Sequence, residues 1–144
     1  MPKSRILVAT DGSAGGSRAV TAAAELARAV DGDLLIVTFA DDVPGAELAE
    51  LARAEGGIAE ALELLAKRIL LEAKERAASI GAPKVRTYNG SGEVAEAIID
   101  TARREQSDII VVGRRGRGRL AGLLLGSVSQ KLVSLAPSPV LVVP

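Results

Sequence analysis

A glycine-rich segment near the C-terminus has the residue types of a phosphate-binding loop. Gly113 and Gly116 are followed, after nine further residues, by Gly126 and Ser127. The segment comes directly after the apolar run Ile109–Val112 and directly before a short helical pattern. Glycines let backbone N–H groups approach phosphate oxygens, and a helix N-terminus adds partial positive charge. We therefore predict phosphate binding here, with Ser127 capping the helix.

Two better-known nucleotide motifs do not describe this loop. A P-loop requires a lysine directly before Ser127, and Gly126 stands there instead. The pattern GxGxxG/A occurs at residues 116–121, but only one strand follows and no acidic residue lies about twenty positions on, so we take it as a chance match. A turn that only reverses the chain is the remaining alternative, and Gly12 or Gly90 fits that description better.

Asp11 is the second candidate, because it lies at the carboxyl end of the apolar run Arg5–Ala9, with Thr10 between them. In open α/β sheets, ligands bind outside the carboxyl ends of the strands. A carboxylate there can accept hydrogen bonds from a ribose or help to hold Mg²⁺. The alternative is a helix cap or an Asx-turn, which the residue type alone favours.

Arg114, Arg115, Arg117 and Arg119 form a third group. Guanidinium groups pair with phosphates or with an acidic partner, and they also bind nucleic acid through its backbone charge. The simplest alternative is a solvated loop, which we expect for at least two of the four. The charged residues of the segment 60–76 are likewise expected to form a solvated helix face.

The missing residue types exclude several chemistries. The chain has no Cys and no His, which rules out a Ser-His-Asp triad and a thiolate nucleophile and argues against a zinc site. Any bound metal should be a hard ion such as Mg²⁺ held by oxygens. With one Tyr, one Phe and no Trp, the chain lacks an aromatic platform for single-stranded nucleic acid.

Charge is unevenly distributed although the net charge is zero. Residues 41–100 hold twelve acidic and seven basic residues, whereas residues 101–144 hold two and seven. The basic end suits an anionic ligand, but a basic footprint over the whole domain for duplex nucleic acid is missing. The apolar run near the N-terminus is too short for a signal peptide or a membrane span, so we expect a cytoplasmic protein.

Apolar runs alternate with helical patterns along the whole chain. The expected strands are Arg5–Ala9, Asp33–Ala40, Lys84–Tyr88 as an edge strand, Ile109–Val112 and Val140–Val143. The expected helices cover 13–30, 58 to about 79, the segment around 94–102, and 127–135, with a further short helix opened by Pro44 and a turn at 89–92. This alternation predicts one domain with an open five-stranded parallel sheet and helices on both faces, in a flavodoxin-like or related doubly wound order.

Three segments together resemble the universal stress protein family. They are the DGS at 11–13, the pattern VVG-xx-G-(nine residues)-GS-VS at 111–129, and the apolar close APSPVLVV at 136–143. The resemblance covers essentially the whole chain. The glycine spacing is similar to that of the ATP-binding branch of the family.

The resemblance implies strand order 3-2-1-4-5 and ATP lying across the ends of the first and fourth strands, with Asp11 at the ribose. It also implies a homodimer formed through the last strand, Pro139 to Val143. From the residue types we expect Mg²⁺ to be held through the phosphates and Asp11, and from the short apolar run we expect no membrane association. The implied nucleotide-binding residues are Ala9, Thr10, Asp11, Thr38, Val112, Gly113, Arg114, Gly116, Gly126, Ser127, Val128 and Ser129.

Four functions are consistent with these residues. A non-catalytic nucleotide-binding protein in stress response or signalling is the first. A slow Mg²⁺-dependent ATPase is the second, although the chain supplies no evident base to orient water. A dimeric interaction module without nucleotide is the third, and a nucleic-acid-binding protein, which would rest on four arginines alone, comes last.

Overall fold

Five parallel strands form one sheet. The computed structural model describes residues 2–39, 49–50, 53, 56–114 and 125–144. The strands are β1 (Arg5–Ala9), β2 (Asp33–Phe39), β3 (Lys84–Gly90), β4 (Ile109–Gly113) and β5 (Val140–Val143). Their order across the sheet is β3-β2-β1-β4-β5, and every neighbouring pair is parallel. The predicted fold class and strand order are therefore confirmed.

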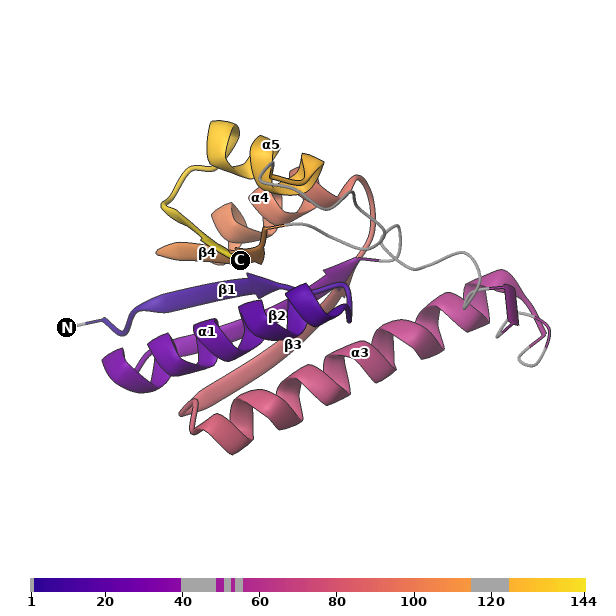
Figure 1. Cartoon of the computed structure of the whole chain (residues 1–144), viewed down its shortest axis with the longest axis horizontal. Coiled ribbons are helices and arrows are strands. Elements are labelled where there is room, and N and C mark those ends of the chain that lie inside the picture. The colour runs from indigo at the N-terminus through magenta and orange to yellow at the C-terminus, as the bar shows by residue number, and fades with distance from the viewer. Residues whose placement is uncertain (1, 40–48, 51–52, 54–55, 115–124) are drawn as a thin grey trace.

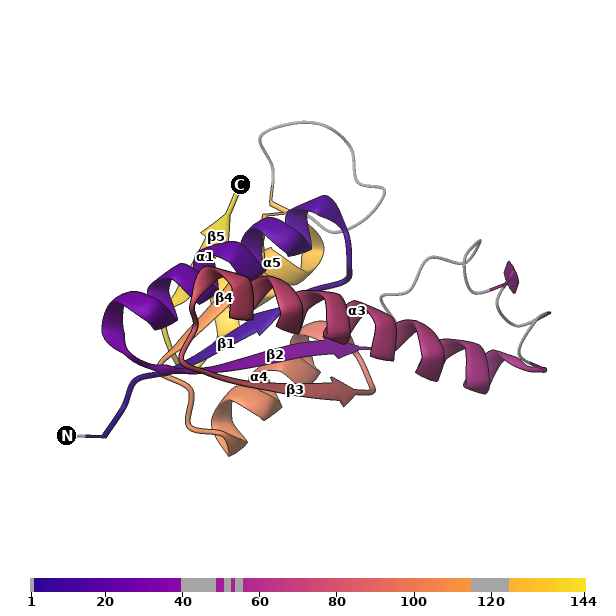
Figure 2. The ribbon, with the colours of Figure 1, turned by 90° about the horizontal axis from the view of Figure 1, so that it is seen from below.

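Two helices cover each face of this sheet. The helices are α1 (Ala14–Val30), α3 (Ile58–Ile80), α4 (Val94–Arg104) and α5 (Ser127–Leu135). Figures 1 and 2 show α1 and α3 on one face and α4 and α5 on the other. The central strand β1 is apolar from Ile6 to Ala9 because successive side chains enter two different cores: Val8 packs on the α1 and α3 side and Leu7 on the α4 and α5 side.

Local signals set the ends of α1. Ser13 caps its start, since its hydroxyl accepts a hydrogen bond from the N–H of Gly16. Asp31 ends the helix in a left-handed conformation with φ of 52°. Both ends lie where the sequence predicts them.

The third strand is longer than predicted. It continues through Asn89 and Gly90, which pair with Thr38 and Phe39 of β2, so the expected turn at 89–92 begins only at Ser91. The reason is steric: a Cβ atom on Gly90 would overlap the ring of Phe39, and the glycine lets the strand run beneath that ring. Ala40 and the short helix expected at Pro44 lie outside the described residues.

Candidate functional site

The ends of three neighbouring strands bring the predicted site residues to one edge of the sheet. Val8 of β1 lies beside Ile36 of β2 and beside Val111 of β4. The residues that follow these three positions, among them Thr10, Thr38 and Gly113, therefore lie close together at the carboxyl ends of the strands. Thr10 is tied to β2 directly, because its N–H donates to the carbonyl of Val37 at 3.0 Å.

The DGS turn after β1 is held by its own side chains. The Thr10 hydroxyl accepts from the N–H of Gly12 at 3.1 Å, and Asp11 Oδ1 accepts from the N–H of Ser13 at 2.9 Å. Gly12 has φ of 80°, which favours glycine. Asp11 is only 5% exposed. One of its oxygens thus forms the Asx-turn that the residue type favours, and the carboxylate is fixed in place.

Helix α1 begins very close to this turn. A Cβ atom on Gly16 would overlap the hydroxyl of Thr10 and come within 2.9 Å of Asp11 Oδ1. The absence of a side chain at Gly16 therefore lets the first turn of α1 pack against Thr10 and Asp11. This close packing leaves Asp11 and Thr10 little room to change position.

The glycine-rich loop is closed at its base by hydrogen bonds. The N–H of Arg114 donates to the carbonyl of Val143 at 2.7 Å, and the N–H of Gly126 donates to the carbonyl of Arg114 at 2.8 Å. Ser129 is buried, and its hydroxyl lies within 2.8 and 2.9 Å of the carbonyl oxygens of Gly113 and Arg114. Residues 114 and 126 are thus adjacent in space, and Ser129 joins α5 to the end of β4.

Gly126, and not Ser127, is the N-cap residue of α5. This corrects the predicted cap by one position, and no side-chain hydrogen bond caps the helix. The Ser127 side chain is exposed and Val128 is half-buried. The first turn of α5 therefore keeps backbone N–H groups that no capping side chain satisfies, at the carboxyl end of β4.

Arg114 carries a buried polar atom with no acceptor. Its Nε atom is shielded from solvent and, within the described residues, no hydrogen-bond partner lies near it. A buried donor without an acceptor is unfavourable, so an added anion there would be stabilising. Gly116, together with Arg115, Arg117 and Arg119, lies outside the described residues.

Several known proteins are similar in sequence to this chain over nearly its full length. The sequence profile of the Universal stress protein family matches residues 3–144. The chain belongs to this family. A universal stress protein of Thermus aquaticus is 38% identical over 138 residues, covering 96% of each chain. Another, from Mycobacterium tuberculosis, is 36% identical over 143 residues, covering 96% of this chain and 94% of the relative.

Solved structures of universal stress proteins also share the fold. One in complex with cAMP superposes with a TM-score of 0.75 at 29% identity, and the match covers 100% of this chain and 99% of that one. The family member UspA of Lactobacillus plantarum superposes with a TM-score of 0.80 at 25% identity, with the same coverage. The sheet order and the paired strand ends described above are therefore features that this chain shares with its family.

A small cavity borders the DGS turn of this family member. It measures about 50 Å³ and lies between α1 and α3, where Thr10 and Gly12 meet Glu72 and Arg76. Sequence reasoning assigns Glu72 and Arg76 to a solvated helix face and misses their place beside the turn. No local signal marks this contact, because Gly12 and Glu72 are 60 positions apart in the sequence.

The described residues contain no cluster of metal ligands and no helix that could span a membrane. No group of three or more Asp, Glu, His or Cys residues there is arranged to hold a metal ion. None of the described helices has the length and apolar character needed to cross a membrane.

A charged cluster ties α5 to the start of α4. Lys131 Nζ lies 3.4 Å from a carboxylate oxygen of Glu93 and 3.3 Å from one of Glu96. The backbone N–H of Glu96, with smaller contributions from Ala95 and Lys131, lowers the pKa of Glu93. Hydrogen bonding to Glu96 and Glu93 raises the pKa of Lys131. The helix that follows the glycine-rich loop is thereby linked to a second helix on the same face.

Proposed function

We propose that this chain binds ATP across the carboxyl ends of β1 and β4 and acts as a non-catalytic nucleotide-binding protein in a stress response or in signalling. The uncapped start of α5 is the observation that carries this proposal. Ser13 and Glu93 cap the first N–H groups of α1 and α4, whereas α5, like α3, has no side-chain cap. Of these two uncapped helices, α5 is the one that follows β4 and the glycine-rich loop. A phosphate is the ligand that such N–H groups, beside Gly113 and Gly126, would best accept.

The proposed phosphate contacts come from the end of β4 and the start of α5, and the proposed ribose contact comes from the turn after β1. The phosphates would lie on Gly113, Gly116, Gly126 and the first turn of α5, Ser127 to Ser129, with Arg114 and Val112 beside them. The Ser129 hydroxyl already contacts two carbonyl oxygens. The Ser129 side chain would therefore hold the base of the loop, and the Ser129 backbone would face the ligand. Asp11 would accept hydrogen bonds from the ribose.

The nucleoside would lie over the ends of β1 and β2. Ala9 and Thr10 would flank it, and the backbone at Thr38 would contact the adenine. The bond between Thr10 and Val37 holds these two strand ends in register. A family member of the same fold has been solved with cAMP, which supports an adenine nucleotide as the ligand. Mg²⁺ would be carried mainly by the phosphates, with Asp11 nearby.

Slow ATP hydrolysis is the competing function. It predicts Mg²⁺-dependent phosphate release that disappears in Asp11→Ala. The proposed binding role predicts no release above a blank without protein. A malachite green assay over several hours separates the two.

Isothermal titration with ATP, ADP and cAMP tests the proposed site. Gly126 has φ of −69°, which any residue adopts, so a valine there introduces no left-handed backbone strain, and its side chain would stand at the start of α5, where the phosphate is proposed to bind. We expect Gly126→Val to weaken ATP binding at least about tenfold while the melting temperature changes little. Ser134→Val on the exposed side of α5 is the matched control and should bind like the wild type. Unchanged affinity in Gly126→Val would contradict the proposed site.

A further inference from the structure

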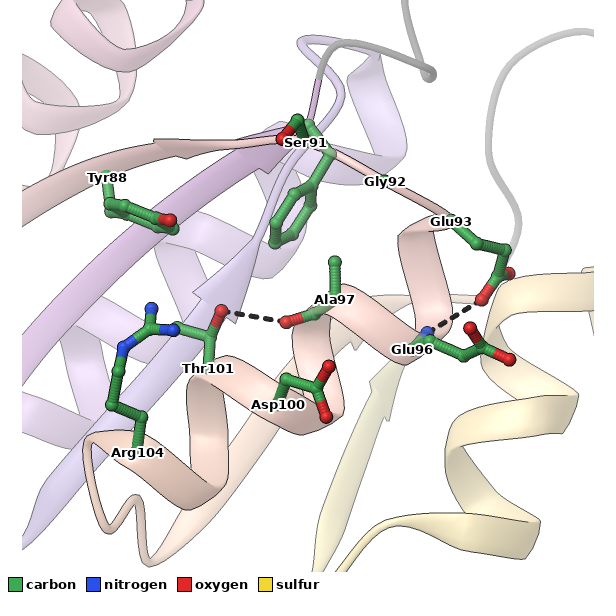
Figure 3. Close-up of a pocket in the computed structure, with 10 residues that line it drawn as sticks. Tyr88, Ser91, Gly92, Glu93, Glu96, Ala97, Asp100, Thr101 and Arg104 are labelled. Carbon is green, nitrogen blue, oxygen red and sulfur yellow. Dashed lines mark hydrogen bonds between the residues drawn. The ribbon is translucent and has the colours of Figure 1, made fainter.

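A second pocket lies between the edge strand β3 and helix α4, away from the proposed nucleotide site. Its volume is about 240 Å³. Figure 3 shows Tyr88 on one side of the pocket and Ala97, Asp100, Thr101 and Arg104 of α4 on the other. No residue of the proposed nucleotide site lines it. The pocket therefore needs an explanation of its own.

Both aromatic side chains of the chain line this one pocket. The sequence has a single Phe, a single Tyr and no Trp, and the pocket is bordered by Phe39 and Tyr88. Phe39 is 3% exposed and packs over Gly90, whereas Tyr88 is 41% exposed at the edge strand. The wall they form is apolar at its base and open at its rim.

A positive charge already rests on part of this wall. The guanidinium carbon of Arg104 lies 5.4 Å from the centroid of the Tyr88 ring. A cation within about 6 Å of a ring centroid is attracted by the negative face of the aromatic ring. Arg104 therefore already occupies one face of the Tyr88 ring, at the end of the pocket that the two residues share.

The opposite wall carries carboxylates. Glu96 and Asp100 are four residues apart on α4 and therefore lie on the same side of the helix. Figure 3 shows both along the pocket. Lys131 pairs with Glu96 and Glu93, whereas Asp100 forms no ion pair among the described residues. The hydroxyl of Thr101 is satisfied by the carbonyl of Ala97 at 2.7 Å.

We propose that this pocket binds a small organic cation, namely a primary ammonium group on a hydrocarbon stem of about six carbons. The ammonium would sit at Asp100, beside the pair formed by Glu96 and Lys131, and the stem would lie against Phe39, Ala97 and the exposed part of Tyr88 that Arg104 leaves uncovered. Carboxylates disfavour a phosphate here, and aromatic faces together with carboxylates are what an organic cation requires. The volume is adequate, since a cavity of about 150 Å³ accommodates benzene.

Tyrosine fluorescence gives a direct test. Because the chain has one Tyr and no Trp, its intrinsic emission reports Tyr88 alone. We expect n-hexylammonium chloride, added to the full-length protein without nucleotide, to change this emission with half-saturation near about 1 mM. Hexanol and hexanoate have the same stem without the positive charge and should produce no saturable change.

A matched pair of variants tests the charge. Asp100→Asn keeps the shape of the side chain and should weaken n-hexylammonium binding about threefold to tenfold. Glu75→Gln removes one negative charge from an exposed site on α3 and should leave binding unchanged. Circular dichroism checks that both variants fold. An equal response to hexanol, or an Asp100→Asn variant that binds like Glu75→Gln, would overturn the proposal.

Discussion

At the scale of single residues, Asp11 has two roles. It shapes the turn after β1, and its carboxylate is proposed to bind the ribose. Its Oδ1 atom accepts from the N–H of Ser13 and shapes the turn. The bond can form without the negative charge of the carboxylate, because an amide oxygen is also a hydrogen-bond acceptor. A substitution that keeps the oxygen and removes the charge therefore separates the two roles.

We predict that Asp11→Asn retains the fold and weakens ATP binding about tenfold, since a hydrogen bond to a charged group contributes about 1.5–3 kcal/mol. The loss should be specific to the ribose. Wild-type protein should bind ATP more tightly than 2′,3′-dideoxy-ATP, and this preference should shrink in Asp11→Asn. Titration calorimetry with both nucleotides measures it, and Asp100→Asn serves as the control. An unchanged ribose preference would show that Asp11 does not contact the sugar.

At the scale of elements, the sequence predicts the strands well because their signals are local. The run Ile109–Val112 is apolar without interruption, and it forms a strand covered on both faces. The parallel arrangement of β1 and β4 then places Asp11 and Gly113 together at the carboxyl ends of these neighbouring strands. The candidate site could be located to this extent from sequence alone.

The details that the sequence did not predict depend on contacts between distant segments. The end of β3 is set by Gly90 beneath the ring of Phe39, and those residues are about fifty positions apart. Ser129 turns its hydroxyl toward carbonyl oxygens of β4, which no residue pattern shows. The pocket between β3 and α4 unites Phe39 and Tyr88 only after the sheet has formed.

The stability that Lys131 of α5 contributes by pairing with Glu93 and Glu96 at the start of α4 should depend on pH. The folded-state pKa of Glu93 lies below its ordinary value of 4.5, so its contribution to stability is present above pH 4.5 and is lost as the pH falls through the lowered pKa. The pKa of Lys131 is raised above 10.5, so its contribution is present below that pH and lost above it.

We therefore predict that Lys131→Met lowers the melting temperature slightly near pH 7 and that this difference is smaller at pH 3. The cluster is exposed, so the effect should be small. Differential scanning calorimetry at the two pH values measures it. Lys67→Met, which removes an exposed pair within α3, is the comparison. A Lys131→Met difference that is equally large at pH 3 would assign the effect to packing rather than to charge.

At the scale of the whole molecule, the two edges of the sheet differ in a way that bears on self-association. The edge strand β3 carries Lys84 and Arg86, and exposed charges hinder pairing with another strand. The other edge strand, β5, consists of Val140 to Val143 and has no charged residue. An unprotected apolar edge is favourable for pairing between two copies, so we place the proposed homodimer interface at β5 and not at β3.

Leu141 offers the sharpest test of that interface. It is 39% exposed on β5, and Val133 and Leu135 of α5 add further exposed apolar surface, at 55% and 56%. Burying such surface between two copies would stabilise a dimer, whereas a lysine there would place a charge in the interface. We predict that the wild-type protein is a dimer at micromolar concentration and that Leu141→Lys is a monomer with unchanged secondary structure.

Sedimentation velocity distinguishes these states. Leu71→Lys is the matched control, because Leu71 is 58% exposed on α3 and far from β5, and it should leave the dimer intact. The base of the glycine-rich loop is bonded to the same strand, through the N–H of Arg114 and the carbonyl of Val143. If both proposals hold, ATP should therefore change the dimer dissociation constant in wild-type protein, and the dimer should change ATP affinity by the same factor. A Leu141→Lys variant that still sediments as a dimer would move the interface away from β5 and remove this coupling.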